Sequence, residues 1–335
     1  RRYFIDNLLF ICFLRVDYIT SASATKRPVN AILSYGTSGR ENSGVKITNN
    51  NIYDFFQPGS TSYGVNIYTY STDFTISNNS LYETTSFTPT SAAANYYPIS
   101  LTGSHTVSGK YIGGSAANCS GTFTKNNGYG NQFVGITLNN SSTTAASIQG
   151  NVIKNISWSN TGNSLWYGIY IQAGKVNIGT VTGNTIGSGT GTSAISVTNT
   201  TTGANVMGIN ISSSDSVSCQ NNIVGAITGT NGATLATNIY GIYKSASTGV
   251  TVISKNTIGS TTTSNSINAS STSSSNPQYV FGISSDGTGN VTISENVIAN
   301  LNNATSNTTT STAGRINGIT LNAGSANTVT DNTIR

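Results

Sequence analysis

A short phrase of alternating apolar and polar residues recurs along the chain. VTISENVI at 291–298 is one copy, and its relatives are VKITNNNI at 45–52, FTISNNSL at 74–81 and NTVTDNTI at 327–334. The shared pattern is V-x-I-x-x-N-x-I. Alternation with period two predicts a β-strand on each side of the Asn, because an amphipathic helix would place apolar residues three and four positions apart.

The phrase occurs nine times between residues 45 and 334, at steps of 29 to 41 residues. An aliphatic residue always lies two positions after the Asn slot. The slot itself holds Asn50, Asn79, Lys110, Asn151, Asn184, Asn222, Asn256, Asn296 and Asn332. The apolar position three residues earlier holds Ile47, Ile76, Val107, Ile148, Val181, Cys219, Ile253, Ile293 and Val329. A repeat of this length indicates a solenoid, in which each unit stacks on the next.

A second phrase, G-[IV]-x-[IL], precedes most copies of the first, as in GITL at 135–138 and GIYI at 168–171. Each repeat therefore carries three short strands separated by turns, and each strand is expected to pair in parallel with its counterpart in the next repeat. We predict an all-β fold, a parallel β-helix solenoid of about nine coils over residues 42–335. The Ser-, Thr- and Gly-rich stretches 187–205 and 259–278 are expected to be loops.

The nine phrases, which span residues 45–334, resemble those of the right-handed parallel β-helix, the pectin-lyase-like repeat proteins of bacterial surfaces. The resemblance implies a ladder of stacked asparagine side chains at the Asn slot. Asn tolerates left-handed backbone geometry, and its amide both donates and accepts hydrogen bonds, so it suits a sharp turn and a ladder. The alternative is a set of exposed turn asparagines without a ladder. The ladder would comprise Asn50, Asn79, Asn151, Asn184, Asn222, Asn256, Asn296 and Asn332.

Charge is scarce and is concentrated near the amino terminus. Charged residues make up 7% of the chain, and residues 42–335 contain nine basic and seven acidic side chains. No basic stripe follows a phosphate backbone, so nucleic-acid binding is not expected.

Residues 1–41 are interpreted as a leader or cap, in which RRYFIDNLLFICFL and SASA at 21–24 resemble a secretory signal peptide. An apolar cap over the first coil, or sequence outside the mature protein, is the alternative. The C-terminus is expected to be truncated within a repeat.

Strict alternation along the second phrase predicts that the residue before the Gly points inward and the residue two after it points outward. The outward set includes Tyr170, Asn210 and Tyr243 on successive repeats, with the two tyrosines about 10 Å apart. Sugar rings pack against aromatic faces that lie beside amides. We interpret this trio as a glycan-contact patch, and isolated surface tyrosines are the alternative. The inward set would comprise Tyr63, Val134, Tyr167, Met207, Tyr240 and Phe281.

Ionisable residues form no recognisable catalytic set. Enzymes of the resembled family carry catalytic Asp, Lys or Arg residues on an outward strand face and its loops, whereas the outward set here has none. Asp54 and Glu83 occupy equivalent positions on successive repeats and come closest to a cation-binding pair. A solvated edge is the alternative for this pair. His105 and Cys219 are expected to pack within the fold, and no metal site, cofactor or disulfide framework is predicted.

The leading hypothesis is a non-enzymatic extracellular or cell-surface repeat segment, such as an adhesin, stalk or filament-like scaffold, with a polysaccharide or a cell surface as its partner. A polysaccharide lyase, glycoside hydrolase or carbohydrate-binding module is the alternative, and carboxylates clustered on one face would distinguish it. Ice or surface binding is a third hypothesis, but it needs a regular Thr array, and the middle residues of V-x-I form one interrupted column.

No run is apolar and long enough to span a membrane. Unpaired strands at the two ends predict end-to-end self-association.

Overall fold

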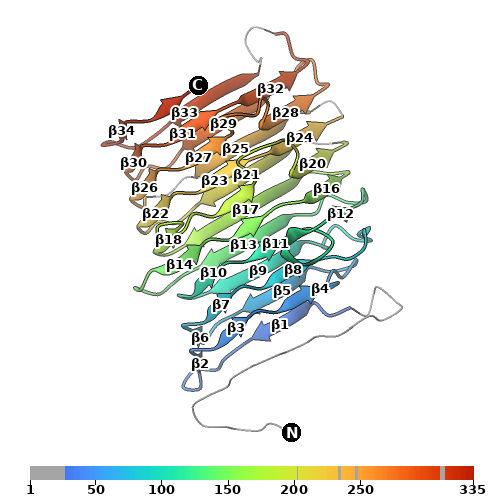
Figure 1. The fold of residues 1–335 in the computed structure, drawn as a ribbon, viewed down its shortest axis with the longest axis vertical. Helices are drawn as coiled ribbons and strands as arrows, with labels where there is room; N and C mark the ends of the chain where they lie inside the picture. The colour runs from blue at the N-terminus through green and yellow to red at the C-terminus, as the bar shows by residue number, and fades with distance from the viewer. Residues whose placement is uncertain (1–26, 202, 233–234, 246–247, 310–313) are drawn as a thin grey trace.

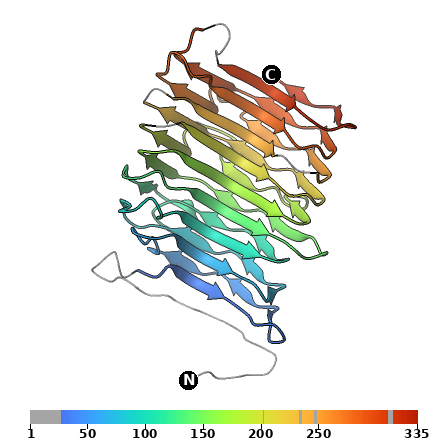
Figure 2. The ribbon, with the colours of Figure 1, turned by 180° about the vertical axis from the view of Figure 1, so that it is seen from behind.

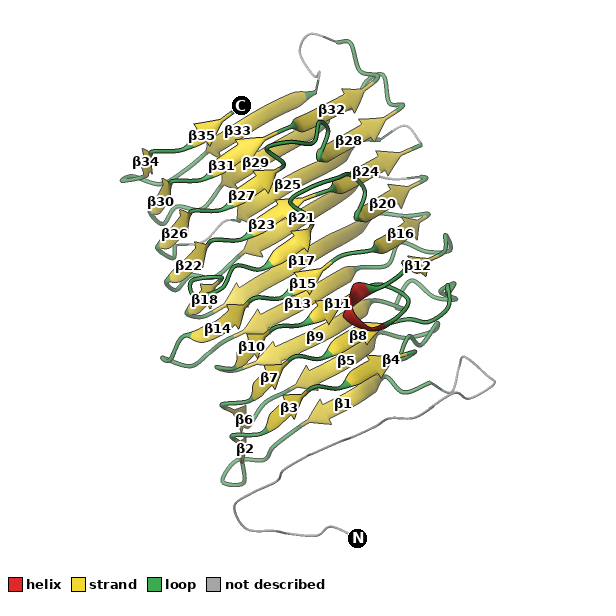
Figure 3. Ribbon diagram, in the orientation of Figure 1, coloured by secondary structure: helices red, strands yellow, loops and turns green. Residues whose placement is uncertain are grey.

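Parallel strands from successive repeats stack along one axis, and the chain advances along it from β1 (Asn30–Ser34) to β35 (Thr333–Ile334) (Figures 1 and 2). This computed structural model describes residues 27–201, 203–232, 235–245, 248–309 and 314–335. The fold is a right-handed parallel β-helix of nine coils with a three-strand pattern in each coil, as predicted. The short 3-10 helix η2 (Ala117–Cys119), red in Figure 3, is a small exception to the strands and loops.

Three nine-stranded sheets form the sides of the solenoid, and each coil begins with a strand of sheet I. Sheet I contains β1 (Asn30–Ser34), β5 (Ser62–Ile67), β9 (Tyr96–Thr102), β13 (Phe133–Asn139), β17 (Ser164–Ala173), β21 (Ala204–Ile211), β25 (Thr237–Lys244), β29 (Tyr279–Ser285) and β33 (Arg315–Leu321). Sheet II contains β3 (Lys46–Thr48), β7 (Thr75–Ser77), β10 (Thr106–Ser108), β14 (Ala146–Gln149), β18 (Val176–Ile178), β22 (Val217–Gln220), β26 (Thr251–Ser254), β30 (Val291–Ser294) and β34 (Thr328–Thr330). Sheet III contains β4 (Asn51–Tyr53), β8 (Ser80–Tyr82), β11 (Tyr111–Ile112), β15 (Val152–Ile153), β19 (Thr185–Gly187), β23 (Ile223–Gly225), β27 (Thr257–Gly259), β31 (Val297–Ala299) and β35 (Thr333–Ile334).

A fourth sheet joins the solenoid from the third coil onward, and the sequence analysis did not predict it. Two of its strands lie in the stretches 187–205 and 259–278, which were expected to be loops. Buried and outward-facing residues alternate in both of these strands. Ile195, Val197 and Ile267 are buried, and polar residues that face outward lie between the buried positions. Sheet IV contains β12 (Phe123–Lys125), β16 (Ile156–Asn160), β20 (Ile195–Asn199), β24 (Ile227–Asn231), β28 (Ile267–Ser271) and β32 (Leu301–Thr305), and a separate two-stranded sheet contains β2 (Asn42–Ser43) and β6 (Ser71–Thr72).

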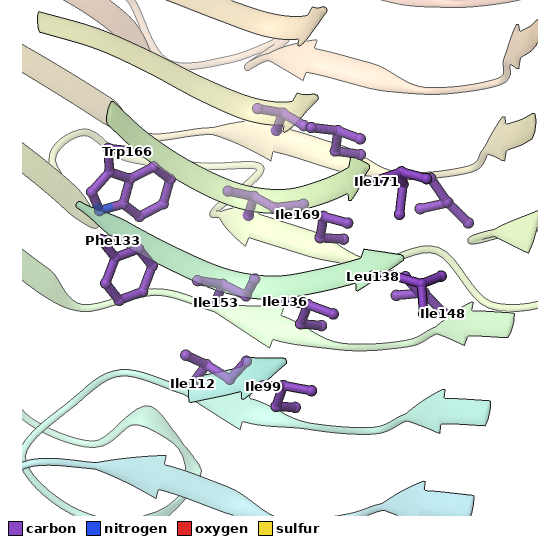
Figure 4. Packing of buried hydrophobic residues seen from close by; sticks show 14 of the residues in the cluster. Ile99, Ile112, Phe133, Ile136, Leu138, Ile148, Ile153, Trp166, Ile169 and Ile171 are labelled. Carbon is purple, nitrogen blue, oxygen red and sulfur yellow. The ribbon is translucent and has the colours of Figure 1, made fainter. Parts of the chain in front are cut away.

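Apolar side chains fill the interior in columns that follow the strand register. Ile136 of β13 pairs with Ile169 of β17, and Phe133 pairs with Trp166 in the same two strands (Figure 4). All four side chains are fully buried. Burial of one such side chain contributes roughly 1.5–3 kcal/mol before the entropy of ordering the chain is subtracted.

The asparagine ladder is present at the corner between sheets II and III. In one step of it, Asn184 donates from its backbone N–H and from Nδ2 to Oδ1 of Asn222, at 3.0 and 2.8 Å. Nδ2 of Asn184 also donates to the carbonyl of Ile148 in the preceding coil. The amide is therefore satisfied although it is buried. The ladder has two parts, Asn50–Asn79 and Asn151–Asn184–Asn222–Asn256–Asn296–Asn332, with Lys110 between them.

The left-handed residue of this turn is the one before the ladder position, which corrects the expected reason for the Asn. In eight coils this preceding residue has φ between 55° and 60°. The ladder position itself is therefore selected for its hydrogen bonds and not for its backbone. The left-handed residues are Asn49, Asn78, Gly109, Gly150, Asn221, Lys255, Glu295 and Asp331.

The register predicted for the fifth coil is wrong. Val181, expected to be buried, is 86% exposed, because β18 ends at Ile178 and residues 179–183 separate it from the ladder. Ile178 takes the buried place and pairs with Ile148 and Cys219. Gly179, Thr180 and Val181 are inserted after the strand. The sequence around Val181 therefore matches the phrase, although the buried strand has already ended.

The solenoid begins before residue 42, the boundary that the sequence analysis assigned to it. Strand β1 lies within residues 1–41 and pairs with β5 in register, with Ile32 opposite Val65. The proposed signal peptide, residues 1–24, lies outside the described residues.

Candidate functional site

A glycine in most sheet I strands interrupts the alternation of side chains. At Gly168, an added Cβ would lie 2.5 Å from the carbonyl oxygen of Gly208 and 2.8 Å from a methyl of Ile186 inside the solenoid. The glycine therefore faces the interior, and so does the next residue, Ile169. Two consecutive inward positions shift the pattern by one residue, so the residue before the glycine points outward. The predicted inward direction is wrong for Tyr63, Val134, Tyr167, Met207, Tyr240 and Phe281.

The outer face of sheet I carries three columns of side chains as a result. They lie three residues before the glycine, one before it and two after it. The first column, rich in amides, contains Asn95, Gln132, Leu165, Asn205, Asn238, Tyr279 and Arg315. The second, aromatic column contains Tyr63, Tyr97, Val134, Tyr167, Met207, Tyr240 and Phe281. The third column contains Asn66, Ser100, Thr137, Tyr170, Asn210, Tyr243, Ser284 and Thr320.

The predicted glycan-contact trio lies together in the third column. Tyr170 pairs with Asn210, and Asn210 pairs with Tyr243 on the next coil. The structure adds two tyrosines that the sequence analysis assigned to the core. Tyr167 stacks on Tyr170 and Tyr240 packs against Tyr243, each with ring centroids 4.8 Å apart. The glycine between each pair was the available signal, since its close contact with the next coil allows both rings to reach the outer face.

The two tyrosine pairs enclose one intervening coil. Adjacent coils are about 4.8 Å apart, so the pairs are about 10 Å apart along the axis. Met207 and Asn210 lie between them and are only 6% and 4% exposed. We call this arrangement the central slot, defined by Tyr167, Tyr170, Met207, Asn210, Tyr240 and Tyr243.

Within the described part of the chain, two polar atoms at this face have no hydrogen-bond partner. They are Oδ1 of Asn210 and Oγ1 of Thr137, which lies two coils before Asn210 in the third column. Thr137 is 5% exposed, and its neighbours Ile136 and Leu138 face the interior, so its side chain lies on the outer side of the sheet, where its hydroxyl is covered. A buried polar atom without a partner costs about 1–3 kcal/mol.

The face is nearly uncharged. Burial raises the pKa of Tyr167 and of Tyr240 to about 12, so both phenols are protonated at neutral pH. Burial, followed by the hydrogen bond to Asp286, raises the pKa of Tyr243 further. The Tyr243 hydroxyl donates to Asp286 at 2.6 Å, and Asn322 Nδ2 donates to the other carboxylate oxygen, also at 2.6 Å.

Asp54 and Glu83 do not form an open cation site, and the solvated-edge interpretation is wrong for Glu83. Glu83 is 1% exposed, and its Oε1 accepts hydrogen bonds from the Phe56 backbone and the Tyr96 hydroxyl. Its Oε2 lies 3.7 Å from the Arg27 guanidinium. Desolvation raises the pKa of Glu83 to about 8, although the Tyr96 hydrogen bond and Arg27 oppose the shift. Asp54 instead accepts hydrogen bonds from Thr84.

The single histidine and the described cysteines are structural. His105 is 3% exposed, its Nδ1 accepts from the Phe74 N–H, and its Nε2 lies 2.9 Å from the Thr102 carbonyl. Cys119 and Cys219 are buried free thiols. In the described part of the chain, no group of three or more His, Cys, Asp or Glu side chains is placed to hold a metal ion.

Hydroxyl side chains occupy two outward columns of sheet II, where one column was expected. Thr292 and Ser294 of β30, for example, both face outward. One of the two columns is nevertheless interrupted by Val252, and the fifth coil presents Asn177 at this position. The regular Thr array required for ice binding is therefore not formed.

In comparisons with known proteins, no family model matches the chain, and neither a curated protein nor a solved structure gives a significant match. Among the described residues, no helix has the length and apolar character needed to cross a membrane.

Proposed function

We propose that the chain is a non-enzymatic extracellular or cell-surface repeat segment of the pectin-lyase-like type, acting as an adhesin, stalk or filament-like scaffold. We further propose that the outer face of sheet I is its contact surface for glycan. The observation that carries this proposal is the central slot, where two pairs of packed tyrosine rings flank the coil of Met207 and Asn210 on the outer face. Tyrosine combines a large apolar ring with a polar end, which suits sugars that present both C–H faces and hydroxyls.

Binding to insoluble and soluble polysaccharides tests the proposal. The full chain and the double variant Tyr170→Ala/Tyr243→Ala are compared by pull-down and by affinity electrophoresis. Loss of two ring contacts is expected to weaken binding about tenfold or more. The matched control is Tyr53→Ala/Tyr82→Ala, which removes a stacked pair on sheet III with ring centroids 5.1 Å apart. Equal binding by both double variants would reject sheet I as the contact face.

The carbohydrate-active enzyme remains the second candidate function. Asp286 favours it, because this carboxylate borders the central slot and contacts Tyr243. Incubation with acidic and neutral polysaccharides, with calcium present, would reveal any new reducing ends. Release that is lost in Asp286→Asn would replace the scaffold proposal with a hydrolase or lyase, whereas no release across the panel supports the scaffold.

A further inference from the structure

Lys125 and Asn160 meet in the interior, at the corner where sheet IV turns toward sheet I. Lys125 ends β12 in the third coil, and Asn160 ends β16 in the fourth. Both residues are fully buried, and Nζ of Lys125 donates to Oδ1 of Asn160 at 2.6 Å. Because Oδ1 is bonded to Cγ at about 1.2 Å, the amine nitrogen lies at most about 3.8 Å from the amide carbon. An amine and a carboxamide held this close can react with each other.

Two further hydrogen bonds aim the amine of Lys125 at Asn160. The carbonyl oxygens of Tyr129 and Ser159 accept from Nζ at 2.9 and 2.6 Å. A charged ammonium group uses its three protons on these two carbonyls and on Asn160. A neutral amine keeps two protons for the carbonyls, so its lone pair is left for the amide carbon of Asn160. The contacts that hold the charged lysine therefore also orient the neutral one for attack.

Burial provides the neutral amine. Removal from water lowers the pKa of Lys125 to about 7, so an appreciable share of the amine is uncharged at neutral pH. The Trp158 ring covers Nζ, which lies 5.2 Å from the ring centroid. The groups that contact Nζ are two carbonyls, one amide and this indole ring, and none of the four is charged.

The Asn160 amide is polarised at both ends. Its Oδ1 also accepts from the Asn131 backbone N–H at 3.1 Å, which places a donor where negative charge would develop on the oxygen. Its Nδ2, the nitrogen that would leave, donates to Oγ of Ser164, a hydroxyl that can pass on a proton. Asn131 is held in place by Trp158, whose Nε1 donates to the Asn131 carbonyl at 3.0 Å.

We propose that Lys125 and Asn160 form an intramolecular isopeptide bond, a covalent link between the third and fourth coils. The neutral Nζ attacks Cγ of Asn160, and the new Nζ–Cγ bond places the negative charge on Oδ1. One proton then passes from Nζ to Nδ2 with Ser164 as the relay, the Cγ–Nδ2 bond breaks, and ammonia leaves. The products are one secondary amide and one ammonia, so the reaction consumes no oxidant, reductant or cofactor. The link is independent of the proposed glycan contact.

Lys110 is an internal comparison within the same coil. It is also fully buried, and burial lowers its pKa to about 6. Its Nζ, however, has no hydrogen-bond partner among the described residues. Contact with a polarised amide, and not burial alone, therefore distinguishes Lys125, and Lys110 is expected to keep a free amine.

Mass spectrometry of the full chain, after prolonged incubation of the folded protein at pH 8, tests the link. The intact mass is expected to be lower than that of the sequence by one ammonia. A tryptic digest is expected to contain residues 111–154 joined to residues 155–175, because trypsin does not cleave after a linked Lys125 but still cleaves after Lys110. A succinimide at an Asn-Gly pair such as Asn127–Gly128 also loses ammonia, but it joins no two peptides. A digest that contains only the separate peptides 111–125 and 155–175 would overturn the proposal.

Two variants separate the reaction from the fold. Lys125→Met keeps a side chain of similar length without the amine, and it is expected to retain the full mass of its sequence. If it still loses ammonia and yields joined peptides, another amine is the nucleophile and the assignment is wrong. Should this variant fail to fold, judged by circular dichroism, the digest of the unmodified chain still decides the proposal.

Ser164→Ala keeps both reacting groups but lacks the proton relay. It is expected to form the link at least about tenfold more slowly, as followed by the joined peptide over time. Equal rates in parent and variant would remove Ser164 from the reaction. In the parent, the rate is expected to rise with pH through about 7 and then to level off, because it follows the neutral amine of Lys125. A rate that is the same at pH 5 and pH 8 would contradict attack by this amine.

Discussion

The early and late coils share the strand pairing of sheets I, II and III but have different interiors. The early coils enclose stacked aromatic rings, and Phe133 and Trp166 lie 5.0 Å apart there. In the same register, Trp166 is followed by Val206 and Ile239 in the next two coils. The aromatic set of the early coils comprises Phe55, Phe56, Phe87, Tyr96, Phe123, Phe133, Trp158 and Trp166.

Buried charge follows the same division. The second and third coils bury three side chains with a carboxyl or amino group, those of Glu83, Lys110 and Lys125. In the described late coils, the buried side chain of this kind is that of Lys244. Lys125 is satisfied by the carbonyls of Tyr129 and Ser159 and by Asn160, but Lys110 Nζ has no partner among the residues that the structure describes. The comparison teaches that strand pairing defines the coil, while the interior can vary at a cost to stability. The early coils are therefore expected to be the more sensitive to mutation and to pH.

Removing an early ring should have the largest effect. Trp166→Ala is expected to lower the free energy of unfolding by about 3–5 kcal/mol, because a large cavity opens between coils. In the same column, Ile239→Val should cost only about 0.5–1.5 kcal/mol. Urea denaturation followed by circular dichroism measures both. Similar costs for the two substitutions would show that the aromatic interior is no more sensitive to mutation than the aliphatic interior.

Glu83 should give the early coils a stability that falls as pH rises. Its pKa is about 8 in the fold, above the usual 4.5, so the folded state binds the extra proton between these values. The stabilising protonated form is complete below about pH 4.5 and is lost as pH rises through about 8, a change on the order of 5 kcal/mol. Glu83→Gln keeps an acceptor for Tyr96 and should remove this dependence. The midpoint of urea unfolding is measured at pH 5 and pH 8 for both proteins. If the midpoint of the variant changes with pH as much as that of the parent, Glu83 is not the group responsible.

Lys110→Asn should make the third coil resemble the others. Burial lowers the pKa of Lys110 to about 6, so between about 6 and 10.4 the unfolded state binds the extra proton and stability rises with pH. The Asn variant removes this rise and joins the two parts of the ladder. A gain of about 1–3 kcal/mol at pH 7 is expected, the cost of one buried polar group without a partner.

The reciprocal substitution sharpens the test of Lys110. Asn222→Lys places a lysine in a regular coil, where it would break the hydrogen bonds to Asn184 and Asn256. It should destabilise the chain by more than Lys110→Asn stabilises it, because both neighbours also lose a partner. Fluorescence of Trp158 and Trp166 reports the coils nearest Lys110, since these are the two tryptophans of the chain. A Lys110→Asn variant no more stable than the parent would mean that the ladder break carries no cost.

The coil architecture could be predicted because its constraints repeat in the sequence. Asn222 belongs to a column that holds Asn in eight of nine coils, and Ile258 belongs to a column that is always a branched aliphatic residue, so many weak signals add up. The ladder was predicted for the right residues but for a partly wrong reason, since the left-handed geometry belongs to the preceding position, as at Asn221. A single phrase could not distinguish these two needs.

The features that the sequence did not reveal depend on contacts between coils. The outward direction of Tyr167 follows from the approach of Gly168 to the next coil, which strict alternation cannot anticipate. Asp54 and Glu83 hold equivalent positions in the phrase, yet one is partly exposed and the other is buried beside Tyr96. Two strands of sheet IV, β20 and β28, were expected to be loops because Ser and Thr also dominate loops.

The hydrogen bonds between coils run along the solenoid axis, and this direction determines how the chain would carry mechanical load. Tension between the two ends acts on the interfaces between coils in series, so the weakest one yields first and the coils peel apart one at a time. The third coil, where Lys110 interrupts the ladder, is the expected point of yielding. Tension applied across the axis, along the strands, would instead shear whole rows of hydrogen bonds together.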